Sequence, residues 1–283
     1  MFSALCLQGS SIRATGRWKD KKFFSTVLME VLYEEATIQS RFRWIERSVV
    51  SGVIARTILL DAMTKRYIDE HPESTVINIA CGMDTRVYCV DNGRIRWFNL
   101  DLPETIDIRR RFLQEEGRIS MIAASAMDEV WTASVGAVTG DLLVIVEGLT
   151  MYLTEQYVKQ MLDIIASRFE MNAVTVFLEY MSPLVVKRVK EKSIDQSGAK
   201  FIWGAKSGAD ICRLSPSFRL IEDRSLVEGM AVMYPIYKVI GKIKPIRNLS
   251  NKIAVMEKTM WYSVQAVLIV TADMRTGWEI QVG

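Results

Sequence analysis

Short apolar runs alternate with amphipathic stretches along the middle of the chain, and this alternation restricts the fold more than any other feature. Five runs have the length and apolar character of strands, at residues 74–80, 94–101, 118–125, 141–148 and 173–181. Residues 102–116 and 154–169 have the pattern of helices, with Pro103 and the N-cap residue Thr154 near their starts. Strands that alternate with helices indicate a parallel sheet, because each crossover helix returns the chain to the same edge.

Two further runs, residues 218–226 and 251–259, are predicted as the last strands. They bring the number of strands to seven. We therefore predict an α/β fold, a Rossmann-like, doubly wound and mainly parallel seven-stranded sheet.

Residues 1–70 are predicted as a helical N-terminal cap, because apolar residues recur every three or four positions in 21–42 and 51–71. The second stretch ends before Pro72, which disfavours helix at the residue preceding it. We expect one domain over residues 1–283, divided as follows: the cap, a cofactor-binding core at 71–182, a polar lid or insertion at 183–217, and C-terminal strands with a tail at 218–283.

Composition argues against several partners. The 36 basic and 33 acidic residues leave a net charge of +3, without the clustered excess that nucleic-acid binding needs. No apolar run reaches the ~18 residues of a membrane span, and no basic region precedes the apolar stretch at the start. The four cysteines form no metal-binding or disulfide pattern, so we expect no metal and a reducing, cytoplasmic location.

The sequence holds one histidine, His71, just before Pro72 and the first strand. Ligands of open parallel sheets bind beyond the carboxyl ends of the strands. His71 is therefore expected at the opposite edge, which argues against a histidine general base.

The segment VINIACGMDTRVY, residues 76–88, places a turn of small residues directly after the first strand. Gly82 lets a ligand approach the backbone, and Asp101 follows 19 positions later at the end of the second strand. An acid about 20 residues beyond such a turn suits ribose hydroxyls. The glycines of a G-x-G-x-x-G pyrophosphate site are missing, so a ligand with a ribose but no phosphates is favoured, such as S-adenosylmethionine.

Five segments in order resemble the leucine carboxyl methyltransferase family: ARTILLD, VINIACGMDTRVY, WFNLDLPETIDIRRRFL, SAMDEVW and VIVEGLTMYLTEQ. The likeness is to its bacterial small-molecule branch, similar to the tetracenomycin-type polyketide O-methyltransferases. It covers residues 40–180 and, more loosely, 218–259. The resemblance implies a class I methyltransferase fold and S-adenosylmethionine as cofactor.

The resemblance also implies residues for the methionine and ribose parts of this cofactor. Arg56 would pair with the methionine carboxylate, which suits the forked donors of a guanidinium. Ala80, where the family often has glycine, would form the turn around the methionine part with Gly82 and Asp84. Asp101 would accept hydrogen bonds from the ribose hydroxyls.

Other positions are implied at the adenine and at the acceptor. Leu102 would lie beside the adenine, and Ser125 and Ala126 would face its edge. Glu147 would lie near the cofactor's amino group or the acceptor, and Tyr152 would shape the acceptor pocket. Glu147 and Tyr152 are the candidate catalytic residues.

The implied reaction is direct displacement of a methyl group by an oxygen nucleophile. A carboxylate acceptor needs no base at neutral pH, whereas an alcohol does. We therefore favour a carboxylate or an acidic hydroxyl of a small molecule, with a base built from Glu147 or Tyr152 as the alternative. A nicotinamide-dependent oxidoreductase, a non-catalytic S-adenosylmethionine-binding protein and a protein methyltransferase remain alternatives. The sequence leaves the acceptor's identity and the oligomeric state open.

Overall fold

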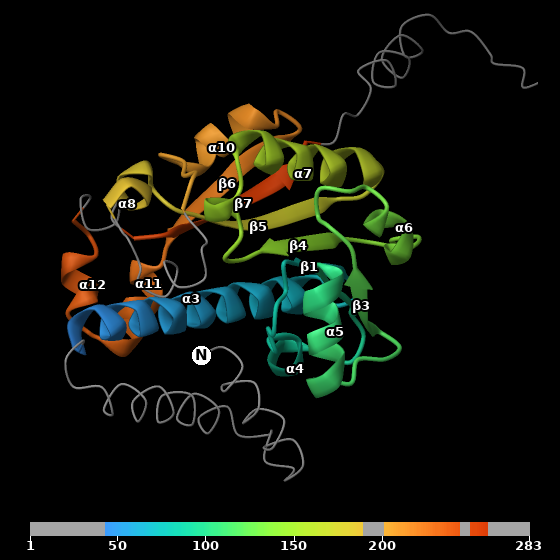
Figure 1. Cartoon of the computed structure of the whole chain (residues 1–283), viewed down its shortest axis with the longest axis horizontal. Helices are drawn as coiled ribbons and strands as arrows, with labels where there is room; N and C mark the ends of the chain where they lie inside the picture. The colour runs from blue at the N-terminus through green and yellow to red at the C-terminus, as the bar shows by residue number, and fades with distance from the viewer. Residues whose placement is uncertain (1–42, 189–200, 244–249, 260–283) are drawn as a thin grey trace, which may run out of the picture.

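The computed structural model describes three ranges of the chain, residues 43–188, 201–243 and 250–259 (Figure 1). The predicted helix at 21–42, part of the predicted lid and the tail after Met260 lie outside the described residues. The division of the chain into cap, core, lid and tail stays a prediction.

A seven-stranded sheet forms the centre of the molecule, in the order β3-β2-β1-β4-β5-β7-β6. The strands are β1 (Thr75–Ile79), β2 (Arg96–Asp101), β3 (Ile119–Ala123), β4 (Leu142–Val146), β5 (Val174–Tyr180), β6 (Phe218–Ser225) and β7 (Lys252–Lys258). The first five are parallel, and β7 runs antiparallel to both β5 and β6. The predicted fold class is confirmed.

Helices cover both faces of this sheet (Figure 1). They are α3 (Arg43–Glu70), α4 (Val87–Val90), α5 (Pro103–Phe112), α6 (Trp131–Val135), the 3-10 turn η2 (Thr150–Tyr152), α7 (Glu155–Arg168), α8 (Pro183–Arg188), α10 (Gly208–Leu214), α11 (Val227–Met233) and α12 (Tyr237–Ile240). Helices α3 and α4 pack on one face, while α6, α7 and α10 pack on the other. No described helix combines the length and apolarity that a membrane span requires.

Strand β4 shows why the sheet is covered on both faces. All five of its residues, LLVIV, are buried. Leu142, Val144 and Val146 join the core beneath α7, whereas Leu143 and Ile145 join the core beneath α3. A strand that is apolar on both sides is stable only between two helical layers.

Local sequence signals correctly predicted the starts of two helices, α7 and α5. The side chain of Thr154 accepts a hydrogen bond from the Tyr157 amide, as an N-cap does. Pro103 opens α5, but this helix ends at Phe112 and not at residue 116 as predicted. The prediction was too long because the chain becomes extended at Leu113, and Glu115 reaches back to a buried arginine of the same helix, Arg109.

One short helix, α11, packs against the middle of α3. Helix α11 crosses α3 so closely that a Cβ atom at Gly229 would lie 2.0 Å from the carbonyl oxygen of Ala55. Only a glycine permits this approach. The contact fixes the backbone immediately before Arg56.

Candidate active site

The predicted site residues lie on several elements along the carboxyl edge of the parallel strands. Strand β1 lies between β2 and β4, where the order of the sheet reverses direction. Ligands of doubly wound sheets bind at this point. The turn after β1, the end of β2 and the end of β4 meet here, and α3 contributes Arg56.

The turn after β1 uses left-handed backbone at two positions. Ala80 has φ 54° and Gly82 has φ 50°. Between them the Cys81 amide donates to the Leu100 carbonyl of β2 at 3.1 Å, so the turn stays attached to the sheet. The left-handed residues reverse the chain where a ligand is expected to approach the backbone.

Asp101 ties the end of β2 to this turn. One carboxylate oxygen accepts from the Gly82 amide at 2.8 Å and the other from the Leu102 amide at 2.7 Å. A carboxylate has about four lone-pair positions, so each oxygen retains acceptor capacity for a hydroxyl. Leu102 itself is exposed, which suits contact with a ligand ring.

Arg109, which the sequence analysis missed, holds the same turn from beneath. Its side chain is fully buried and donates to the carbonyls of Gly82, at 3.0 Å, and Asp84, at 2.8 Å. Burial alone would lower the pKa of Arg109, but its hydrogen bond with Glu115 raises it. The one sequence signal for its burial was its position on the same side of α5 as Ile106, within three consecutive arginines at residues 109–111.

Arg56 lies beside two carboxylates. Its Nε is 2.5 Å from an oxygen of Glu147, and its Nη1 is 3.3 Å from an oxygen of Glu179. The Nε–H does not point at the Glu147 oxygen, so that contact is an ion pair without an aligned hydrogen bond. Burial opposes the charge of Arg56, but Glu179 and Glu147 raise its pKa overall.

Glu179, at the end of β5, was also missed. It is fully buried and accepts from the Gly148 amide and from Asn251 Nδ2, both at 2.8 Å. Its partners come from the loop after β4 and from the residue before β7. Glu179 therefore fixes Arg56 relative to three strands. A buried acid at the end of a central strand was the available signal, as it was for Glu147.

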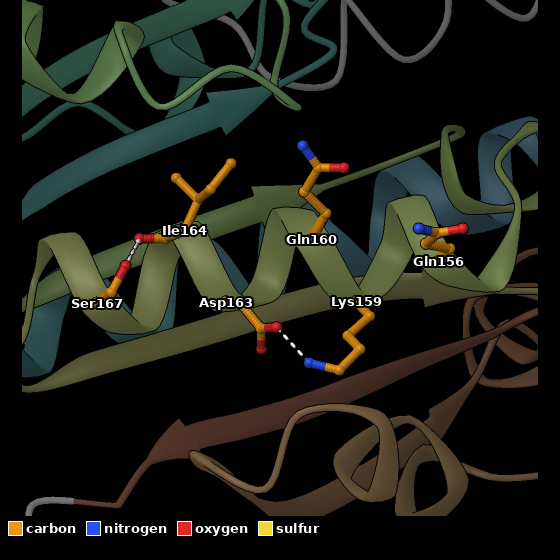
Figure 2. Close-up of a pocket in the computed structure, with 6 residues that line it drawn as sticks. All are labelled: Gln156, Lys159, Gln160, Asp163, Ile164 and Ser167. Carbon is orange, nitrogen blue, oxygen red and sulfur yellow. Dashed lines mark hydrogen bonds and ion pairs between the residues drawn. The ribbon is translucent and has the colours of Figure 1, made fainter.

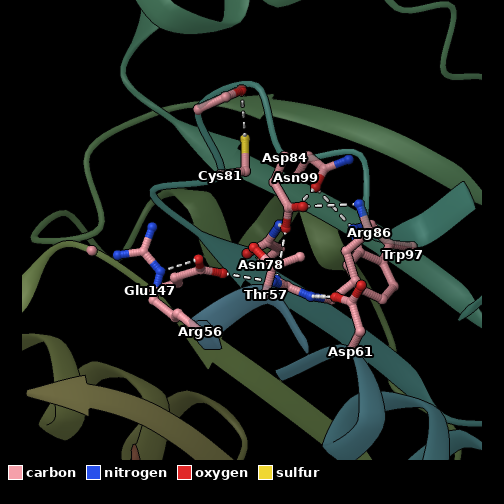
Figure 3. A network of polar contacts seen from close by, with 12 residues as sticks. Arg56, Thr57, Asp61, Asn78, Cys81, Asp84, Arg86, Trp97, Asn99 and Glu147 are labelled. Carbon is pink, nitrogen blue, oxygen red and sulfur yellow. Dashed lines mark hydrogen bonds and ion pairs between the residues drawn. The ribbon is translucent and has the colours of Figure 1, made fainter. Parts of the chain in front are cut away.

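Both oxygens of Glu147 are taken by guanidinium groups. Arg56 contacts Oε1, and Arg86 donates to Oε2 at 2.6 Å (Figure 3). Burial would raise the pKa of Glu147, but Arg86 and then Arg56 hold it below its usual range. Glu147 is therefore held as a carboxylate between two guanidinium groups.

Asp84 joins this network from the turn. Its Oδ1 accepts from the Arg86 amide at 2.8 Å, and its Oδ2 accepts from Arg86 Nη1 at 2.8 Å and from Asn78 Nδ2 at 2.9 Å. Asp84 thus supports the turn through contacts within the protein, and its predicted part in cofactor binding stays a prediction.

The remaining predicted residues lie around this centre. Ser125 and Ala126 follow β3, where the preceding Ala124 amide donates to the Asp101 carbonyl at 3.0 Å. Tyr152 lies in η2, with its ring 5.3 Å from that of Phe201. This turn follows β4 and is tied to β5, because the Thr150 hydroxyl donates to the Glu179 carbonyl at 2.6 Å.

His71 lies at the other edge of the sheet, as predicted. Its Nδ1 is 2.8 Å from an oxygen of Asp141, the residue directly before β4. Its ring stacks on Tyr67 at 4.4 Å. This histidine is remote from the carboxyl ends of the strands.

A separate hollow lies along the outer side of α7 (Figure 2). It is lined by residues of one helix, all of them with polar side chains except Ile164: Gln156, Lys159, Gln160, Asp163, Ile164 and Ser167. None of the residues discussed above lines it. We therefore do not assign the acceptor to this hollow.

The sheet order and the carboxyl-edge site define the class of protein, a class I methyltransferase fold. The fold resembles a putative methyltransferase from Thermobifida fusca (TM-score 0.53, 14% identity, 81% of this chain and 87% of that one). It also resembles a DUF574 family protein from Streptomyces avermitilis (TM-score 0.52, 11% identity, 81% and 96%).

The chain belongs to the leucine carboxyl methyltransferase family, whose sequence model matches residues 16–166, more than half of its length. This match begins nearer the N-terminus than the resemblance at residues 40–180 indicated. Membership makes the chain an S-adenosylmethionine-dependent methyltransferase. The nicotinamide-dependent alternative is therefore set aside.

Two relatives are similar in sequence. The tetracenomycin polyketide synthesis O-methyltransferase TcmP of Streptomyces glaucescens is 29% identical over 193 residues, which cover 67% of this chain and 70% of the relative. The S-adenosyl-L-methionine-dependent methyltransferase dpfgK of Gibberella zeae is 28% identical over 167 residues, 54% of this chain. The match spans only 56% of the length of dpfgK.

Proposed function

We propose that this methyltransferase modifies an oxygen of a small molecule, a carboxylate or an acidic hydroxyl. When bound, S-adenosylmethionine supplies an electrophilic methyl group on a sulfonium, which an oxygen nucleophile displaces. The chain's own part is to align the two reactants and to exclude water. The similarity to an O-methyltransferase of polyketide synthesis supports an oxygen acceptor of small size.

One observation carries the preference for an ionised acceptor, the occupation of both Glu147 oxygens by Arg56 and Arg86. A carboxylate held in this way with a lowered pKa is unsuited to take a proton from an alcohol. His71 lies at the opposite edge of the sheet. An acceptor that is already an anion needs neither group.

The residues present fit the cofactor. Asp101 offers acceptor capacity to ribose hydroxyls, and Arg56 offers donors to the methionine carboxylate. The left-handed turn at Ala80 and Gly82 brings backbone close to the same place. Leu102, Ser125 and Ala126 surround the position proposed for the adenine, at the ends of β2 and β3.

Tyr152 is proposed to shape the acceptor side. Its side chain is partly exposed and pairs with Phe201 at the end of β4 and β5. The proposed role of Tyr152 is contact with the acceptor. For Glu147 we propose that it fixes the position of Arg56, in place of the catalytic role that the sequence predicted.

Cofactor binding is tested by calorimetry with S-adenosylmethionine on the wild type, Asp101→Ala and Arg56→Ala. Each substitution should weaken binding by about 1–3 kcal/mol, because each removes hydrogen bonds that involve a charged group. Asp107→Ala, on the exposed side of α5, is the control. Unchanged affinity in both site variants, with intact folding by circular dichroism, would refute the placement.

The acceptor class is tested with labelled methyl donor and a panel of small carboxylic acids, phenols and aliphatic alcohols. Methyl esters hydrolyse in mild base and aryl ethers do not, so product lability separates the two acceptor groups. Turnover of carboxylates or acidic phenols is expected. Turnover of aliphatic alcohols alone, with an essential group titrating near neutrality, would contradict the proposal, and so would cofactor binding without any transfer.

A further inference from the structure

Arg86 is an almost fully buried arginine that joins three parts of the site. Its side chain is 2% exposed, and each of its donor nitrogens has a carboxylate partner. Nε lies 2.6 Å from Asp61 of α3, Nη1 2.8 Å from Asp84 of the turn, and Nη2 2.6 Å from Glu147 after β4 (Figure 3). A planar guanidinium with its donors in three directions fixes these partners relative to one another.

Glu147 lies between Arg86 and Arg56 and gives one oxygen to each. The position of Glu147 therefore depends on Arg86. If Arg86 were removed, both oxygens of Glu147 would be available to Arg56, and a bidentate pair is the geometry that a carboxylate and a guanidinium prefer. Such a pair would use the donors that a ligand carboxylate needs.

The charges around these arginines favour a ligand with a cationic group as well as a carboxylate. Two guanidinium groups face four carboxylates, those of Asp61, Asp84, Glu147 and Glu179. Negative charge is thus in excess within the described site. An α-amino acid group supplies a carboxylate for Arg56 and an ammonium for this excess.

We propose that Arg86 is a positioning residue for the amino-acid end of the cofactor. It holds one oxygen of Glu147 and so keeps donors of Arg56 available to the cofactor's carboxylate. Arg86 itself does not touch the cofactor. This inference rests on the proposed placement of the methionine part at Arg56.

The test compares two ligands by calorimetry on the full chain. S-Adenosylhomocysteine has the amino-acid group, and 5′-methylthioadenosine has the adenosine and sulfur without it. Arg86→Lys keeps the charge but cannot reach three carboxylates. It should weaken S-adenosylhomocysteine binding about tenfold or more. Methylthioadenosine binding should change by less than about threefold.

Arg118→Lys is the matched control. Arg118 also pairs with a carboxylate through both end nitrogens, at 3.1 Å from Asp91, but it lies in the segment before β3, away from the carboxyl edge. The ratio of the two dissociation constants should stay at its wild-type value. Equal weakening of both ligands by Arg86→Lys, or no change in either, would overturn the proposal.

A double-mutant cycle tests whether Arg86 acts through Glu147. Glu147→Gln removes the carboxylate that would pair with Arg56 through both oxygens. In that background Arg86→Lys should therefore cause less than about threefold further loss of S-adenosylhomocysteine binding. A loss as large as in the wild-type background would overturn the inference, and Arg86→Gln replaces Arg86→Lys in the cycle if the latter does not fold. A wild type that binds methylthioadenosine but not S-adenosylhomocysteine refutes the placement at Arg56, and one that binds neither refutes the proposed cofactor site.

Discussion

At the scale of single residues, the site contains two energetically unfavourable features. One is a left-handed backbone conformation, and the other is a set of neighbouring carboxylates. Ala80 adopts a left-handed conformation that residues other than glycine, asparagine and aspartate rarely adopt. Asp61 keeps a carboxylate beside Asp84 and Glu147, with Arg86 as its counterion. Both features are tolerated because the surrounding network fixes them.

Replacing Ala80 by glycine should stabilise the protein. The left-handed conformation costs an alanine about 1–2 kcal/mol. Glycine loses about 0.5–1 kcal/mol more entropy on folding. The free energy of unfolding in urea should therefore rise by about 0.5–1 kcal/mol. The control Ala62→Gly, exposed in α3, should lower it by about 1 kcal/mol. Equal destabilisation by both substitutions would show that residue 80 is not left-handed.

Asp61 should make stability depend on pH. Burial, opposed by Arg86 but reinforced by Asp84, raises the pKa of Asp61 to about 6, although 31% of the side chain stays exposed and water moderates the effect. A raised carboxyl pKa means that the folded state binds the proton more tightly. The stabilising contribution is complete below the unfolded pKa of about 4 and is lost as the pH rises through about 6.

Urea denaturation at pH 4.5 and pH 7 measures this dependence. The stability lost between these values should be smaller in Asp61→Asn than in the wild type, because the titrating group is gone. Asp69→Asn, exposed on the same helix, controls for the loss of one negative charge. Identical pH profiles for wild type and Asp61→Asn would contradict the expectation.

At the scale of elements, close packing between helices positions Arg56. The strands and longer helices could be predicted because their periodicity is local, and Thr154 and Pro103 marked two helix starts. The contact of α11 with α3 could not be predicted from VEGMAVM. The need for a glycine at position 229 becomes clear only when the neighbouring backbone of α3 is known.

Gly229→Ala should destabilise the protein by about 1–3 kcal/mol, because the new Cβ would meet the Ala55 carbonyl and push the helices apart. Gly52→Ala, in α3 with no atom within 4 Å of its new Cβ, should stabilise by about 0.5–1 kcal/mol. Thermal melting measures both. A site displaced by the clash should also bind S-adenosylmethionine less tightly in Gly229→Ala alone. A stabilising effect at both positions would rule out the close crossing.

At the scale of the whole molecule, β7 joins the edge strand β6 to the parallel part of the sheet. It pairs with β5 on one side and β6 on the other, and its Ile253 and Met256 enter the cores on opposite faces. The C-terminal strands therefore share one core with Ala80 of the turn after β1. This arrangement supports the prediction of a single domain.

Met256→Ala should test this cooperativity. The side chain is fully buried, so its truncation should cost about 2–5 kcal/mol. If the described strands form one unit, far- and near-ultraviolet circular dichroism should still report one coincident transition at lower urea. A separate early transition in the variant would show that β6 and β7 unfold independently.

The sequence by itself determined the fold class, the turn at Gly82 and its acid at Asp101, because strand periodicity and the spacing along a βαβ unit are local properties. It did not determine which charged residues pair inside the site. Arg86 meets partners 25 and 61 positions away, and Arg56 meets Glu179 across 123 positions. Only the tertiary structure decided these pairs, because packing of α3 and the order of the strands select which charges are buried together. The position of β7, antiparallel between β5 and β6, also became known only from the tertiary structure. Pairing between strands from distant segments has no local sequence signal.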